Sequence, residues 1–252
     1  MSVIQGKRKR SKKKLVYWTL LVVLVLAVGF VHNAFNGNPV SKWLGGREVG
    51  RYLAETYPGR EFRVKDGFYN FKDSGYAYQV VEIGTSGEKG KAMEYDFTVR
   101  GAMPRVVSDG IRYANLDTEL IERLAKEAGV ELKGLLQPAL PLEIKMVDPQ
   151  LEVVKGELPP ETKWEKGLVL DPLMSLYVLL NAEGATPQTM LEAAGEIQRT
   201  LNQEGYRYSR VMLNANGFDG KDAKDEHGYV KYAVAFEPDT KLAAKDVETY
   251  NQ

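Results

Sequence analysis

Hydrophobic and polar positions divide this chain into one long apolar segment and a remainder with the shorter periods of helices and strands. Residues 15–31 read LVYWTLLVVLVLAVGFV, carry no charge, and have Thr19 as their most polar side chain. A helix of that length rises roughly 25 Å, slightly less than the hydrocarbon core of a bilayer, which is about 30 Å thick. Ala34 and Phe35 lengthen the apolar surface. The pattern therefore predicts a transmembrane helix over residues 15–35.

Two other interpretations of this segment stay open. A basic start, an apolar middle and the small residues Ala27 and Gly29 are also typical of a cleaved signal peptide, and a buried helix of a soluble domain is the third possibility. We favour the uncleaved anchor because the apolar run continues to Val31. Tyr17 and Trp18 also suit the headgroup level of a membrane, where amphipathic rings are enriched.

The pattern of residues 36–134 predicts a helix, an antiparallel meander and a second helix. Asn38 can cap the first helix, Pro39 suits its first turn, and the helix extends to about Tyr57. Glycines inside it indicate a kink or a close packing contact. The second helix begins at the Asn115 cap and ends at Gly129. Strands are expected over residues 61–71, 76–83, 91–100 and 105–112, of which 91–100 alternates most strictly.

The second half, residues 135–252, predicts strand, helix, strand, strand. Thr186 and Pro187 are a strong helix start, and Gly205 ends that helix. This order resembles part of a ferredoxin-like split unit. The strands are expected at residues 142–146, where Pro149 interrupts the pattern, and at 173–181, 206–213 and 230–236, with a short closing helix over 240–250.

The fold class expected is α+β, with an N-terminal transmembrane helix followed by two small tandem subdomains. The first is helix, antiparallel meander, helix, and the second is the ferredoxin-like unit. The expected domains are a basic cytoplasmic stub (1–14), the transmembrane helix (15–35), and two extracytoplasmic subdomains (36–134 and 135–252).

The net charge of zero conceals a strong asymmetry along the chain. Seven of the 34 basic residues lie in Lys7–Lys14 without any acidic residue, so the other 27 stand against all 34 acidic residues, a net charge of −7. Basic flanks stay cytoplasmic, which sends the C-terminal bulk outward. The segment Lys7–Lys14 is expected to attract anionic inner-leaflet lipid, while Leu15–Val31 contacts the bilayer. The acidic remainder argues against nucleic-acid binding.

Few residues have the types and spacing that catalysis or metal binding requires. The chain has no cysteine, which excludes disulfides, thiol chemistry and lipoprotein acylation, and its only histidines are His32 and His227. The loop 214–228 is acidic, but its spacing fails the EF-hand pattern, so we expect a solvated hairpin loop. The glycines of residues 84–90 lack the spacing of a phosphate-binding loop. We therefore expect no metal, no cofactor and no catalytic residue.

Serines, carboxylates and aromatic residues allow only weak hypotheses. Ser74 and Ser86 lack a nucleophile-elbow context, and Glu152 with Glu157 forms a glycosidase pair only if the fold holds the two at the right separation. An aromatic set could form a binding platform, but aromatic residues in a meander more often pack under a helix. This set comprises Phe68, Tyr69, Phe71, Tyr76 and Tyr78.

The order of elements and several short phrases resemble the YfjL-like family of small membrane-anchored proteins of Gram-positive bacteria. The resemblance covers nearly the whole chain and implies a single-pass protein with an outer α+β region. It implies no activity and transfers no functional residue. The phrases that carry it are Asn38–Ser41, Arg51–Leu53, Tyr57-Pro58, Tyr69–Asp73 with Gly75-Tyr76, and Asp171–Tyr177.

These observations favour a non-enzymatic envelope protein, anchored in the cell membrane with its bulk outside, that binds a protein or peptide partner. A carboxylate-dependent hydrolase of cell-wall polymer is the alternative from another class, and a ligand-sensing module is a third. Two carboxylates at the bottom of a cleft would favour the hydrolase.

Overall fold

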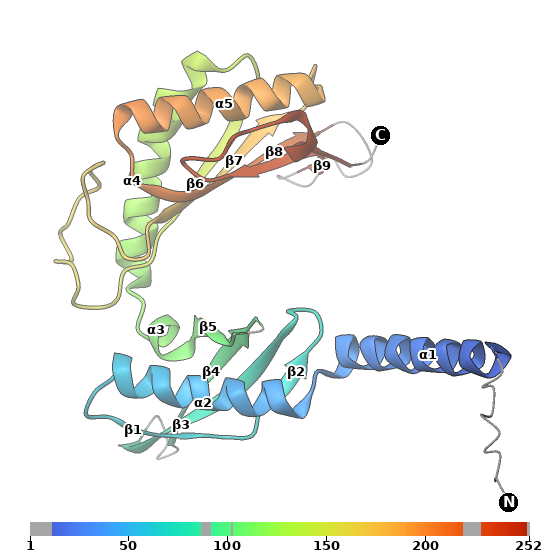
Figure 1. Ribbon diagram of the computed structural model, residues 1–252. Coiled ribbons are helices and arrows are strands. Elements are labelled where there is room, and N and C mark those ends of the chain that lie inside the picture. The colour runs from blue at the N-terminus through green and yellow to red at the C-terminus, as the bar shows by residue number, and fades with distance from the viewer. Residues whose placement is uncertain (1–11, 87–91, 102, 219–227, 251–252) are drawn as a thin grey trace, which may run out of the picture. The chain divides into compact units, whose positions relative to one another are not determined.

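The computed structural model describes residues 12–86, 92–101, 103–218 and 228–250 (Figure 1). The chain forms two compact units, Met1–Ala114 and Asn115–Gln252. Each unit has its own cluster of buried apolar side chains. The two are therefore described separately.

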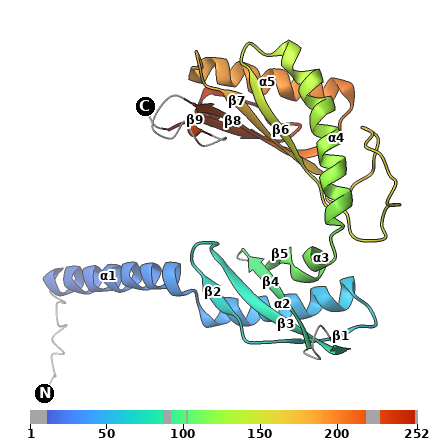
Figure 2. The same ribbon diagram turned by 180° about the vertical axis from the view of Figure 1, so that it is seen from behind.

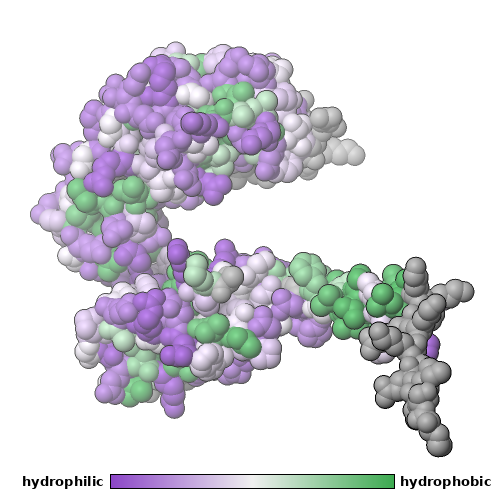
Figure 3. Space-filling model, in the orientation of Figure 1, coloured by the Kyte–Doolittle hydropathy of each residue, from purple (hydrophilic) through white to green (hydrophobic). Residues whose placement is uncertain are grey.

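Helix α1 (Lys12–Asn36) contains the apolar segment. Its residues Lys14–Asn33 are long and apolar enough to cross a membrane, and none of them is buried within the protein. Thr19, the most polar residue of the run, donates its hydroxyl to the carbonyl of Leu15 (3.0 Å), which satisfies it within the helix. Apolar residues accordingly cover the surface of α1 (Figure 3). The predicted apolar helix is confirmed, and a signal sequence would have the same composition.

The rest of the first unit is a sheet with one helix along it. Helix α2 (Pro39–Thr56) begins at the predicted cap, where the side-chain oxygen of Asn38 accepts from the backbone N–H of Ser41 (2.7 Å). The antiparallel sheet has the order β1-β3-β4-β5, with β2 also paired to β3 (Figures 1 and 2). Its elements are β1 (Glu61–Val64), β2 (Phe68–Asn70), β3 (Gly75–Ser86), β4 (Ala92–Arg100) and β5 (Arg105–Asp109), followed by the short helix α3 (Gly110–Ala114).

The core of the first unit lies between α2 and one face of this sheet. Strand β4 alternates as predicted, with Tyr95, Phe97 and Val99 buried while Glu94 and Asp96 are exposed. The same core receives Val49 and Leu53 from α2 and Tyr78 and Val80 from β3. A helix on one face of an antiparallel sheet is an α+β arrangement, which confirms the predicted fold class at that level.

In its described residues, the second unit has two α-helices and a five-stranded mixed sheet of order β10-β9-β8-β7-β6. Strands β7 and β8 are parallel and joined by α5, and the other neighbours are antiparallel. Both helices contribute to one core with Leu176, Val178 and Leu180, which share a face of β7. The elements are α4 (Thr118–Leu136), the 3₁₀ turn η2 (Gln137–Ala139), β6 (Ile144–Gln150), β7 (Met174–Asn181), α5 (Pro187–Glu204), β8 (Tyr208–Gly217), β9 (Tyr229–Phe236), the 3₁₀ turn η3 (Ala244–Asp246) and β10 (Glu248–Thr249).

Helix α5 confirms its predicted ends. The hydroxyl of Thr186 accepts from the N–H of Thr189 (3.2 Å), and the hydroxyl of Thr189 accepts from the N–H of Thr186 (2.8 Å), a reciprocal capping box. Gly205 ends the helix in the left-handed region, with φ of +77°. Both signals are local, because each side chain or glycine acts on backbone groups of its own turn.

Helix α4 departs from the prediction at both ends and in the unit to which it belongs. It begins on Asp117, whose side chain accepts from the N–H of Leu120 (3.2 Å), and not on Asn115. It continues through Gly129, where an added Cβ would lie 2.8 Å from the carbonyl oxygen of Val147. This glycine therefore permits a close approach of β6 instead of ending the helix.

The buried stripe of α4 continues beyond Gly129 and packs into the core of the second unit. The compact units consequently divide between Ala114 and Asn115, whereas the predicted division fell after residue 134. The stripe comprises Leu120, Leu124, Ala128, Leu132 and Leu136.

The ferredoxin-like split unit is not confirmed. In a split unit another strand lies between the two parallel strands, but β7 and β8 are direct neighbours. Pro149 lies inside β6, opposite Leu176, because β6 is an edge strand and its missing N–H needs no partner there. The closing segment holds the turn η3 and the strand β10 where a helix was predicted.

Candidate binding groove on the first unit

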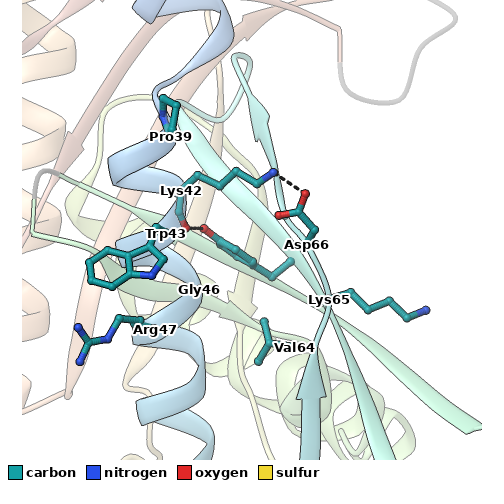
Figure 4. A pocket seen from close by; sticks show the side chains of 10 residues that line it. Pro39, Lys42, Trp43, Gly46, Arg47, Val64, Lys65 and Asp66 are labelled. Carbon is teal, nitrogen blue, oxygen red and sulfur yellow. Dashed lines mark hydrogen bonds and ion pairs between the residues drawn. The ribbon is translucent and has the colours of Figure 1, made fainter.

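An open groove of about 490 Å³ lies between the first half of α2 and the connection from β1 to β2 (Figure 4). The predicted single strand over residues 61–71 is broken at this connection, and the break forms one wall of the groove. The lining residues are Pro39, Lys42, Trp43, Gly46, Arg47, Val64, Lys65, Asp66, Gly67 and Tyr78.

Tyr78 forms the floor of the groove and is held by glycines on both sides. An added Cβ on Gly45 or on Gly67 would lie 2.5 Å from atoms of the Tyr78 side chain, so neither position admits a larger residue without a shift. The buried hydroxyl of Tyr78 donates to the carbonyl oxygen of Lys42. Burial also raises the pKa of Tyr78 to about 12. The close packing contact predicted from the helix glycines is confirmed.

Trp43 and Arg47 form the exposed rim of the groove. The indole is 59% exposed, and the guanidinium carbon of Arg47 lies 4.9 Å from the centroid of its ring, a cation–π arrangement. Lys42 Nζ lies 2.6 Å from Asp66 Oδ2, and this ion pair joins the helix to the opposite wall. The rim therefore presents a flat aromatic face with a cation beside it.

Trp43 was not among the site residues predicted from the sequence. The signal was present in the helical spacing. Trp43 lies six positions before the buried Val49, which places it roughly 120° around the helix from the middle of the buried face. A large aromatic residue on the outer side of an amphipathic helix has no core to fill.

Three charged side chains of the groove already have partners. Lys42 and Asp66 pair with each other, and Lys65 Nζ donates to Gln79 Oε1 (2.8 Å) and Glu94 Oε1 (2.7 Å). No base stands ready to activate a nucleophile among these side chains. The arrangement can stack on and hydrogen-bond a ligand, which is the chemistry of binding.

A buried carboxylate, Asp109, lies elsewhere in the first unit. Its Oδ2 accepts from the hydroxyls of Tyr52 (2.9 Å) and Tyr57 (2.6 Å), and its Oδ1 accepts from the backbone N–H groups of Ile111 (2.9 Å) and Arg112 (3.1 Å). It therefore ties the end of α2 and the segment after it to the start of α3. This fully used carboxylate stabilises the fold.

Glu82 is the other buried carboxylate of the described residues. Arg60 donates to it through Nε and Nη2, both at 2.7 Å, and the hydroxyl of Tyr95 donates at 3.2 Å. The guanidinium of Arg60 also lies over the rings of Tyr57 and Phe62. This charge is paired and hydrogen-bonded, as a buried charge must be.

The buried tyrosines predict a loss of stability in alkali. Burial, with the hydrogen bond to Asp109, raises the pKa of Tyr52 to about 12, and burial raises the pKa of Tyr78 and of Tyr208 to about 12. The folded state keeps these protons after the unfolded chain has lost them, so the tyrosines' contribution to the free energy of unfolding is constant below about pH 10 and falls from there through about pH 12. Urea titrations across this range should show the decline. Tyr78→Phe should make the decline shallower, because it removes one of the three titrating groups.

Among the residues that the structure describes, those singled out in the sequence do not assemble into a second site. His32 is exposed on α1, and Ser74 lies in the turn before β3 with φ of +49°. Glu157 accepts from the backbone N–H of Val154 (2.9 Å), a local turn contact. His227, most of the acidic loop 214–228, and residues 87–90 of the glycine run lie outside the described residues, as does the side chain of Ser86. Where the structure describes the chain, no group of three or more metal-ligating side chains occurs.

The aromatic set divides into two groups. Tyr76 and Tyr78 point towards α2, and their hydroxyls bond to backbone groups of Asn38 and Lys42, as the packing interpretation predicts. Phe68 and Phe71 instead remain 65% and 53% exposed. These two phenylalanines have no place in the core.

The fold and groove define an α+β protein with an N-terminal helix able to cross a membrane and an open aromatic surface beyond it. The chain belongs to the YfjL-like family, because the model of the YfjL-like N-terminal domain matches residues 12–110 and that of the C-terminal domain matches residues 127–248. This confirms the resemblance seen in the sequence.

A relative named "Uncharacterized protein YfjL" from Bacillus subtilis (strain 168) is 29% identical over 237 residues, covering 94% of this chain and 98% of its own. It is consistent with the Gram-positive origin that the resemblance implies. The structure of a DUF5037 family protein from Ruminococcus gnavus ATCC 29149 is 11% identical with a TM-score of 0.23, covering 81% of this chain and 94% of its own, a similarity too low to carry an argument.

Proposed function

We propose that this protein is a single-pass membrane protein whose α+β units lie outside the cell and bind a protein or peptide partner. The observation that carries the proposal is the uncovered apolar surface of α1. Its leucine and valine side chains are about half to two-thirds exposed, and none is buried against the rest of the chain. Such a surface is stable in hydrocarbon and costly in water.

The orientation follows from charge. Basic residues precede the apolar segment, while the remainder has a net charge of −7. The positive-inside rule then leaves the N-terminus in the cytoplasm and both units outside. The same basic residues are attracted to anionic lipid of the inner leaflet.

The groove on the first unit is the binding site in this proposal. Trp43 and Arg47 offer an aromatic face and a cation, the residue types that dominate the energetics of protein interfaces. The connection between β1 and β2 lies along the other wall, and its residues Lys65 and Asp66 are exposed to an extended peptide bound in the groove. A non-enzymatic role is further supported by Asp109 and Glu82, whose oxygens are already used by neighbouring donors.

Site-specific crosslinking in intact cells tests the proposal. The chain lacks cysteine, so Asp66→Cys puts a single photoreactive label on the groove rim, and Ala54→Cys puts the same label at an exposed control position on α2. The label at position 66 should give a discrete adduct, and adding Trp43→Ala should reduce its yield about tenfold or more, because the partner loses the aromatic face on which it stacks. The label at position 54 should give none.

Two results would contradict this function. Equal adducts at both positions would show that the groove has no partner. Turnover of cell-wall polymer by the purified chain, lost on replacing one particular Asp or Glu with the fold intact, would support the hydrolase alternative instead.

A further inference from the structure

Exposed phenylalanines lie at the end of the apolar helix α1 and along the β2 hairpin that contacts this helix. Phe35, 62% exposed, is the penultimate residue of α1, two positions after the end of the membrane-competent stretch at Asn33. Its ring centroid lies 6.1 Å from that of Phe71 in the turn after β2. Phe68 begins β2, roughly 10 Å from Phe71 along the chain, and lies on the face of the hairpin opposite to Tyr69. We name Phe35, Phe68 and Phe71 the aromatic collar.

Specific contacts hold the end of α1 against the β2–β3 hairpin of the first unit. The N–H of Asn38 donates to the hydroxyl of Tyr76 (2.7 Å), and that hydroxyl donates to the carbonyl of Asn38 (3.0 Å). Gly37, with φ of +66°, lies so close to Tyr69 that an added Cβ would be 2.8 Å from its ring. The rings of Tyr69 and Tyr76 are 5.1 Å apart. The hairpin of β2 and β3 is therefore held against the end of the helix.

We propose that the aromatic collar docks the first unit onto the outer surface of the bilayer, with Phe68 and Phe71 inserted at the boundary of headgroups and acyl chains. This inference rests on the proposed membrane anchor, because α1 sets the depth of the collar. Where the apolar stretch of α1 ends, the hydrocarbon ends, and a hairpin fixed there lies at the interfacial level. Aromatic side chains favour that level in membrane proteins.

In this proposal the aromatic collar contacts lipid, because it continues the apolar surface of α1. The polar side chain next to Phe71 also fits a membrane surface, since Lys72 is exposed beside it and can reach lipid phosphates. A docked hairpin would add a second attachment to the span and would fix the first unit, with its groove, against the bilayer.

Fluorescence quenching in proteoliposomes of the full-length chain tests the inference. Four single-cysteine variants would carry the same environment-sensitive dye: Phe68→Cys, Phe71→Cys, Ile83→Cys and Leu24→Cys. Ile83 is the matched control, since it is an exposed aliphatic residue at the far end of β3, roughly 27 Å from Gly75 along the strand. Leu24 lies near the middle of the apolar stretch and reports on the span alone.

Lipids with a spin label near the headgroup boundary should remove most of the emission at positions 68 and 71, and leave position 83 as bright as without quencher. Equal brightness at all three positions, with position 24 quenched by labels deep in the acyl chains, would overturn the docking while the anchor stands. An unquenched position 24 would overturn the anchor itself. Quenching of positions 68 and 71 by soluble iodide but not by lipid would show that they face water or a protein.

Discussion

The double substitution Val23→Arg and Leu24→Arg is expected to release the chain from the membrane fraction. The unmodified chain should stay in that fraction after alkaline carbonate extraction. These residues are at the centre of the apolar stretch Lys14–Asn33. Arginine at the centre of a membrane helix costs about 3 kcal/mol on insertion scales, and the aliphatic residue that it replaces contributes about −0.5 kcal/mol. The two substitutions together cost roughly 7 kcal/mol, enough to reverse insertion.

The control for this experiment exchanges the two side chains, as Val23→Leu with Leu24→Val, and should remain in the membrane. Protease added to intact protoplasts should digest the unmodified chain beyond about residue 40 and leave the basic stub protected. Retention of the double-arginine chain in the membrane would contradict the span. A soluble product beginning near Phe30 would instead identify the segment as a cleaved signal peptide.

Asp109→Ala should destabilise the first unit by roughly 3–5 kcal/mol, since four donors, most of them only partly buried, lose their acceptor at about 1 kcal/mol each. Those donors are the hydroxyls of Tyr52 and Tyr57 and the N–H groups of Ile111 and Arg112. The two units have separate cores, so the second unit should keep its stability. Hydrogen exchange followed by mass spectrometry would show faster exchange across residues 39–109 and little change across residues 118–236.

Two variants sharpen this measurement. Asp109→Asn keeps an oxygen for the backbone donors, and its amide can donate to tyrosine hydroxyls that rotate to accept, so the loss should be only about 1–2 kcal/mol. Asp96→Ala changes an exposed carboxylate of the neighbouring strand and should stay within about 0.5 kcal/mol. A loss for Asp109→Ala no larger than for Asp96→Ala would show that the buried carboxylate contributes little.

The prediction of the candidate site from the sequence was incomplete for a physical reason. Glycines at 45 and 46 indicated close packing, but which ring they faced depended on β3, more than thirty residues later. Trp43 could have been recognised from its helical phase alone. The wall from Val64 to Gly67 could not have been recognised in this way. It forms only because the strand predicted over residues 61–71 is interrupted where Gly67 packs against Tyr78.

The sequence by itself determined those features that depend on residues close to one another along the chain. The length and apolarity of α1, the caps at Asn38 and Thr186, the stop at Gly205 and the alternation of β4 all depend on side chains acting within a turn or two of their own backbone. These local preferences are the same in any fold, so the sequence pattern was sufficient to predict them.

Only the tertiary structure decided which unit α4 joins, that Gly129 lies inside a helix, and that β7 and β8 are adjacent. A glycine can end a helix or admit a strand, and its local signal is the same in both cases. Whether the glycine ends the helix or lies inside it depends on the segment that packs against it, which here is β6 with the carbonyl of Val147. Contacts between residues distant in the chain have no local signature in the sequence. Such contacts also form the groove, the Asp109 network and the aromatic collar.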